Sequence, residues 1–97
     1  MKQYKILKDG KIILSEIPGQ YAGWNGGSKS RRIFGKLDCK SGMRMRKENR
    51  VFFHTLEDAV IQGYRPCKNC CPINEDDFEG IKYLIIEDSL EGFYNRH

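Results

Sequence analysis

A Cys-x-x-Cys pair within the stretch Gly63-Tyr64-Arg65-Pro66-Cys67-Lys68-Asn69-Cys70 constrains this chain more than any other feature. A tight turn can present two thiolates to one metal ion, but two sulfurs do not complete a tetrahedral site. Cys39 lies upstream and gives the spacing Cys-x27-Cys-x2-Cys. Zinc sites favour four ligands drawn from Cys and His. The sequence therefore predicts a metal site with Cys39, Cys67 and Cys70 as ligands, and it leaves the fourth ligand open.

The length of 97 residues indicates one domain with a modest core, which a structural metal would help to stabilise. Residues 1–14 alternate apolar and charged side chains and lack the continuous apolar run of a signal peptide. No segment approaches the roughly 20 apolar residues that span a bilayer. We therefore expect no membrane contact and a cytoplasmic location, where cysteines are more typical of metal ligands or free thiols than of disulfides.

The formal net charge of +4 conceals an uneven distribution of charge along the chain. Residues 29–50 hold nine Lys or Arg against two acidic side chains, whereas residues 73–97 hold seven acidic side chains against two basic ones. A basic middle segment is typical of a surface that faces a polyanion. Neutralisation of the two segments by each other across the fold explains the charges equally well.

Two runs near the N-terminus predict a β-hairpin. The β-rich runs at 4–7 and 11–14 flank Asp9-Gly10, and Gly tolerates the positive φ that a tight hairpin turn needs. Residues 24–30 (WNGGSKS) are rich in Gly and Ser, which predicts a loop.

The middle of the chain predicts a strand followed by a helix. Residues 49–54 have the β-branched and aromatic content of a strand. Thr55 is placed to cap a helix from about Leu56 to Gln62, and Gly63 suits the position that ends it. Pro66 prevents further helix, so the cysteine pair is expected just past a helix end.

The acidic C-terminal segment is expected to be helical. Asn74 through Asp77 provide an acidic start, and the apolar residues from Phe78 to Leu90 roughly follow a helical face. The run 83–86 (YLII) also fits a short strand.

The stretch Gly63-Tyr64-Arg65-Pro66-Cys67-Lys68-x-Cys70, with Ile33-Phe34 and Cys39 upstream, resembles the N-terminal metal-binding domain of the bacterial Ada DNA-repair proteins over about residues 31–72. The resemblance implies a small α+β domain that binds one zinc ion through four cysteines, three of which match Cys39, Cys67 and Cys70. The fourth family cysteine is also the nucleophile that accepts a methyl group from a methylphosphotriester in DNA. Gly35 stands at its position here, so the resemblance does not carry the methyl-transfer activity to this chain.

The expected organisation is a single α+β domain over residues 1–97. Residues 1–28 form an added N-terminal hairpin, residues 29–72 form the Ada-like metal-binding core, and residues 73–97 form an acidic, helical C-terminal extension.

Several groups compete for the fourth ligand position. Cys71 is the nearest thiol, but the side chains of adjacent residues diverge. His54 follows the expected strand, and a lone His is more often a capping or surface residue. Asp38 neighbours Cys39 and diverges from it in the same way, and water would leave an open position. The three cysteines could also be vestigial and remain as apolar packing residues.

The basic residues around the first ligand are the candidates for contact with DNA. Arg and Lys at this density can neutralise several phosphates without reading sequence. A solvated cationic face, or charge balance for the thiolates, is the simpler explanation. The candidate contacts are Arg31, Arg32, Lys36, Arg44, Arg46, Lys47, Arg65 and Lys68.

Three functions follow from these observations. The first is a non-catalytic, zinc-binding accessory module that contacts DNA through phosphates. The second is a structural or protein-interaction module whose metal site only secures the fold or is vestigial, with an acidic segment that covers the basic face or binds an unknown partner. The third is a methyl acceptor in which Cys39 or Cys71 replaces the missing nucleophile.

Overall fold

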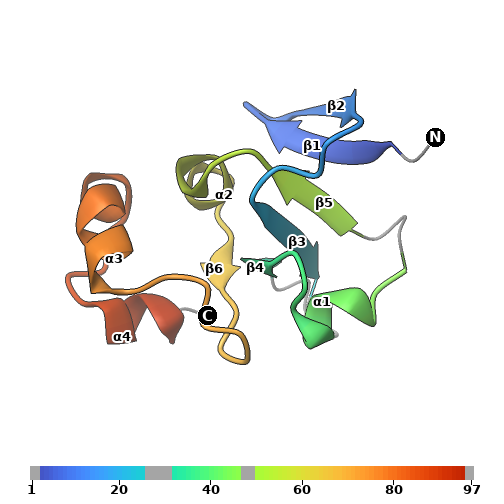
Figure 1. The fold of residues 1–97 in the computed structure, drawn as a ribbon. Helices are drawn as coiled ribbons and strands as arrows, with labels where there is room; N and C mark the ends of the chain where they lie inside the picture. The colour runs from blue at the N-terminus through green and yellow to red at the C-terminus, as the bar shows by residue number, and fades with distance from the viewer. Residues whose placement is uncertain (1–2, 26–31, 47–49, 96–97) are drawn as a thin grey trace.

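The computed structural model describes residues 3–25, 32–46 and 50–95. Within them the chain forms a six-stranded sheet with the order β2-β1-β5-β3-β4-β6 (Figure 1). β1 is antiparallel to β2, β3 is antiparallel to β4 and β5, and the pairs β1–β5 and β4–β6 are parallel. The strands are β1 (Tyr4–Lys8), β2 (Lys11–Ser15), β3 (Tyr21–Asn25), β4 (Arg32–Lys36), β5 (Arg50–Phe53) and β6 (Arg65–Pro66).

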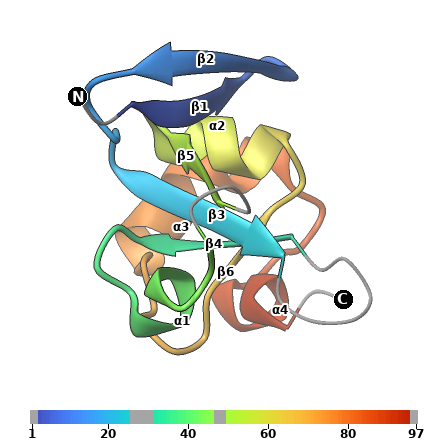
Figure 2. The same cartoon turned by 90° about the vertical axis from the view of Figure 1, so that its right-hand side faces the viewer.

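The helices cover the two faces of this sheet unequally. α2, α3 and α4 lie on one face and α1 lies on the other (Figures 1 and 2). The helices are α1 (Lys40–Met43), α2 (Leu56–Ile61), α3 (Glu75–Ile81), a 3₁₀ helix (Lys82–Leu84) and α4 (Leu90–Tyr94).

Alternation along the strands divides the apolar side chains between two clusters. In β5, Phe52 belongs to the cluster on the α1 face, and Phe53 belongs to the cluster beneath α2, α3 and α4. Ile33 and Phe34 divide in the same way in β4, as side chains of period two must. The α1-face cluster also contains Trp24 and two of the cysteines, so the metal-type residues lie in a core of their own.

The predicted hairpin turn and the two predicted ends of α2 form as expected. Asp9 and Gly10 both have positive φ, 52° and 75°, which is the conformation of a type I′ hairpin turn. The Thr55 hydroxyl accepts a hydrogen bond from the Asp58 amide at 3.2 Å, and Gly63, with φ of 84°, follows the end of α2.

The expected loop at residues 24–30 is wrong at its start. Trp24 and Asn25 belong to β3, and Trp24 is only 3% exposed. Ala22 and Trp24 lie on the same face of β3. Gly23, between them, faces the other way, and because it has no side chain the rings of Phe53 and Tyr64 fit beside it. Residues 26–30 lie outside the described part of the chain.

The C-terminal segment forms α3, the 3₁₀ helix that follows it directly, and α4, and no strand forms at 83–86. The Asn74 side chain and the Asp77 side chain cap each other's backbone amides at the start of α3, at 2.9 and 3.0 Å. The apolar residues Ile73, Phe78, Ile81 and Phe93 are all buried in the same cluster as Phe34 and Phe53. The apolar side of the segment is therefore part of the core.

Candidate metal centre

The three predicted cysteines come from two places in the fold that the sheet brings together. Cys39 caps the start of α1, and its amide donates to the Lys36 carbonyl at 3.0 Å. Cys67 follows β6, and its amide donates to the Phe34 carbonyl at 2.8 Å. Because β4 and β6 are neighbouring parallel strands, the segments that leave them meet at one end of the sheet.

The sulfur atoms of Cys39, Cys67 and Cys70 all lie within 4.8 Å of one another. The Cys39 and Cys67 sulfurs are 3.7 Å apart, and both residues are buried. A tetrahedron with metal–sulfur bonds of about 2.3 Å has edges of about 3.8 Å, so this donor set fits a zinc-type ion. All four cysteines of the chain are free thiols.

Burial raises the pKa of the Cys70 thiol from 9.0 to about 12. The Lys36 amide, which donates to the Cys70 sulfur at 3.4 Å, lowers this pKa, and the neighbouring Cys39 and Cys67 raise it. Without a metal the thiol is therefore neutral near pH 7, and a metal must displace its proton to bind the thiolate.

Position 35 faces this cluster directly. A Cβ atom built on Gly35 would lie 2.8 Å from the Cys70 sulfur, 3.3 Å from Cβ of Cys67 and 2.9 Å from the Trp24 ring. A side chain here would therefore begin against the Cys70 sulfur, so a ligand at position 35 could reach the cluster once the neighbouring atoms had shifted slightly. In this chain position 35 has no side chain, and the Trp24 ring lies against the space that a side chain would occupy.

The candidate fourth ligands lie elsewhere. Cys71 has a positive φ of 46° and is exposed, and its thiol donates to the Lys68 carbonyl at 3.3 Å. His54 is exposed beyond the end of β5. Among the described residues, the group of donor atoms within 4.8 Å of one another contains neither of these side chains, nor that of Asp38.

Two hollows of about 300 Å³ each open beside the cysteines. The first is lined by Lys36, Asp38, Cys39, Lys40, Asn69 and Cys70. The second is lined by Trp24, Ile33, Met45, Arg65, Cys67, Lys68 and Asn69. Each hollow thus combines two cationic side chains with at least one of the clustered cysteines.

The structure divides the predicted basic residues into three groups. Lys36, Arg65 and Lys68 border the cysteine cluster, together with Lys40, which the sequence-based set of contacts missed. Arg32 donates to the Gln62 carbonyl at 3.1 Å, next to the end of α2. Arg44 and Arg46 are exposed after α1, and Arg31 and Lys47 lie outside the described residues.

These features define a small domain with helices, a sheet and a cysteine cluster of the metal-binding type. Residues 22–73 match the family described as "Metal binding domain of Ada", and the chain belongs to that family. The resemblance seen in the sequence is thereby confirmed.

Two curated relatives share this region. The chain is 47% identical over 47 residues to the "Bifunctional transcriptional activator/DNA repair enzyme AdaA" of Bacillus subtilis (strain 168), which covers 48% of this chain and 22% of that protein. It is 33% identical over 75 residues to the "Uncharacterized protein MJ0818" of Methanocaldococcus jannaschii, covering 72% of this chain and 35% of that protein. The chain thus spans well under half the length of either relative. No solved structure gives a significant match.

The described part of the chain contains no helix with the length and apolar character needed to cross a membrane.

Proposed function

We propose that this chain is a non-catalytic Ada-like module that holds one zinc ion through Cys39, Cys67 and Cys70 and contacts DNA through phosphates. The observation that carries the proposal is the pair of cationic hollows beside the three sulfurs. A bound ion would join the start of α1 to the turn after β6 and stabilise the folded state.

Charge supports contact with a polyanion at this place. Three thiolates around a divalent cation leave one net negative charge, and Asp38 adds another. Lys36, Lys40, Arg65 and Lys68 supply four positive charges around the same two hollows. The surplus is positive, which favours phosphate and exceeds what charge balance of the thiolates requires.

The absence of a thiol at position 35 supports binding without methyl transfer. The group that would accept the methyl is missing where the sheet directs a side chain at the cluster. Of the two alternative acceptors, Cys71 is turned toward the Lys68 carbonyl, and Cys39 is only 3% exposed, so a phosphotriester in DNA would not reach its sulfur. We therefore do not propose the third function, the methyl acceptor.

Removing Lys36 and Lys68, two of the basic side chains beside the cysteine cluster, is expected to weaken DNA binding without changing the preference for DNA sequence. For Lys36→Ala/Lys68→Ala, the slope of log affinity against log salt should fall by about 2, since each lost phosphate contact removes about 0.9. Fluorescence anisotropy with several unrelated labelled duplexes, over a range of salt, measures both quantities. Lys8→Ala/Lys11→Ala removes the same charge from the exposed hairpin and is the control. Equal losses in both variants, or no affinity of the parent protein at low salt, would reject the DNA contact.

A second candidate function, a protein-interaction module, is favoured by the edge strand β2. Ile12, Ile13 and Leu14 are 50%, 50% and 61% exposed on a strand that has a neighbour on one side only. An exposed apolar edge strand is a ready template for pairing with another chain. The hairpin precedes residues 22–73, so it lies outside the part that matches the family.

A second copy of this chain suits the edge of β2. In an antiparallel pair centred on Ile13, Ile12 faces the partner's Leu14, and Lys11 faces the partner's Ser15 with the partner's Glu16 beside it. The hairpin turn makes Lys8 and Lys11 a hydrogen-bonded pair, so Ile12 and Leu14 direct their backbone groups outward for this pairing. A parallel pair would instead oppose Lys11 to Lys11.

Ile13→Lys is expected to abolish this dimer, because the twofold axis would place the two new lysines side by side. Sedimentation equilibrium over a range of concentrations measures the dimer fraction. Ile61→Lys, a change at a 57% exposed position in α2, should leave the fraction unchanged. A parent protein that stays monomeric at the highest concentration would remove self-pairing as the role of the edge strand.

A further inference from the structure

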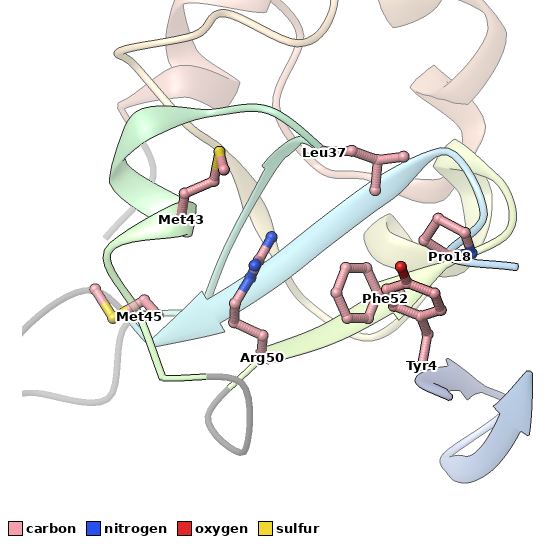
Figure 3. A pocket seen from close by; sticks show the side chains of 7 residues that line it. All are labelled: Tyr4, Pro18, Leu37, Met43, Met45, Arg50 and Phe52. Atoms are coloured by element: carbon pink, nitrogen blue, oxygen red, sulfur yellow. The ribbon is translucent and has the colours of Figure 1, made fainter. Parts of the chain in front are cut away.

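A pocket of about 380 Å³ lies on the α1 side of the sheet, apart from the two hollows beside the cysteines. Its lining comes from β1, β5, α1 and the segments around them, which Figure 3 shows converging on one space. The lining residues are Tyr4, Pro18, Leu37, Met43, Met45, Arg50 and Phe52, and we call this space the Arg50 pocket.

Among the described residues of this lining, Arg50 is the one with a charged side chain. Its guanidinium carbon lies 5.1 Å from the centre of the Phe52 ring, and its Nε atom is buried. Figure 3 shows the side chain extending between the two methionines on one side and Leu37 and Phe52 on the other. Nε has no hydrogen-bond partner among the described residues. Nε itself is closed to solvent, so a ligand in the pocket would have to meet the guanidinium through its two terminal nitrogens.

The other lining residues indicate that the rest of such a ligand should be apolar. Leu37, Pro18 and the two methionines offer aliphatic surface, and methionine adapts to irregular shapes. The guanidinium already lies over the Phe52 ring, so that face of the ring is not free to stack on a nucleobase. The volume lies at the lower end of the range for small-molecule pockets, about 300–1,000 Å³.

The single positive charge of Arg50 indicates which charged group the ligand should carry. A guanidinium presents N–H groups in a fork that matches a carboxylate in two parallel hydrogen bonds. One guanidinium neutralises one charge, and among the described residues that line the pocket there is no second cation. A monoanion therefore fits better than the dianion of a phosphomonoester.

We propose that the Arg50 pocket binds a small organic acid with an apolar body and one carboxylate, the carboxylate pairing with Arg50 and the body lying against Leu37, Met43 and Met45. Among the described residues, this site shares only Met45 with the hollows beside the cysteines. The proposed acid site does not rest on the DNA contact proposed above.

Phenylbutyrate is a suitable probe, with phenylbutanol as a neutral ligand of the same body. Titration of the isotope-labelled protein, as purified, is followed by amide chemical shifts in NMR. We expect saturable shifts at Tyr4, Leu37, Met45 and Phe52 for the acid and binding at least about tenfold weaker for the alcohol, since the charge-assisted hydrogen bonds are lost. Equal affinity for acid and alcohol, or shifts scattered over the surface, would overturn the proposal.

Two pairs of variants separate the site from general charge effects. Arg50→Met should reduce the affinity for phenylbutyrate at least about tenfold, whereas Arg44→Met, which removes an exposed charge outside the pocket, should not. Met43 is 62% exposed, so its substitution should change the stability of the fold by no more than about 0.5 kcal/mol. Met43→Glu should weaken binding of the acid, and Met43→Lys should preserve or strengthen it. The same affinity in Met43→Glu and Met43→Lys would reject the site even if Arg50→Met failed to fold.

Discussion

Phe93→Ala is expected to lower the free energy of unfolding by about 3–5 kcal/mol, the usual cost of removing a fully buried phenylalanine. Phe93 is 0% exposed and lies in α4, yet it packs in the cluster that contains Phe34 and Phe53 of the sheet. Domains of this size are stable by about 5–15 kcal/mol, so one substitution near the C-terminus should remove a large share of the total.

Urea denaturation of the metal-loaded protein, followed by tryptophan fluorescence, measures this loss. Tyr83→Ala is the matched control, because Tyr83 is an aromatic residue of the same segment that is 77% exposed. Its effect should stay within about 0.5 kcal/mol. Similar small losses in both variants would mean that α4 does not belong to the core.

This burial also decides how the acidic segment can be studied. Deleting residues 73–97 would remove Phe78, Ile81 and Phe93 from the core together with the acidic charges. New DNA binding by such a truncated chain would report unfolding as readily as an unmasked surface. Substituting exposed acidic residues, such as Glu75 and Asp76 at the start of α3, tests the charge without disturbing the core.

The parts of the fold that the sequence predicted are those with local physical signals. The positive φ at Asp9-Gly10 and the side-chain cap at Thr55 depend on residues within a few positions of each other. The Cys67–Cys70 turn is equally local. The approach of Cys39 depends on the β4–β6 pairing, and the prediction of all three ligands together rested on cysteine spacing and family resemblance.

The parts that were missed depend on contacts between distant segments. Trp24 was assigned to a loop because of the glycines that follow it, although Ala22 and Trp24 already show the alternation of a strand. Lys40 and Arg50 were no more distinctive than the other basic residues in their segment. Only the folded chain brings Lys40 into one hollow with Cys70, and Arg50 into one pocket with Tyr4.

Gly35→Cys is expected to increase the affinity for zinc or cobalt by on the order of a hundredfold. A structural zinc site with four ligands binds with about 10–16 kcal/mol, and one quarter of that range is roughly 3 kcal/mol. The place of position 35 is the physical reason, because its Cβ would lie 2.8 Å from the Cys70 sulfur and 3.3 Å from Cβ of Cys67. Competition with a chromophoric chelator measures the affinity. Cobalt absorption counts the thiolates, since the charge-transfer band should grow by about a third on going from three sulfurs to four.

Gly35→Ala separates the new thiol from the added bulk. Both variants place a Cβ atom 2.8 Å from the Cys70 sulfur and 2.9 Å from the Trp24 ring, so without metal both should be destabilised by about 1–3 kcal/mol. Only the cysteine can recover that loss by binding the ion. If Gly35→Cys bound metal no better than Gly35→Ala, position 35 would not reach the ion, and the fourth ligand would have to be another group or water. If it bound a hundredfold better, Gly35 alone would account for the difference between this site and one with four cysteines.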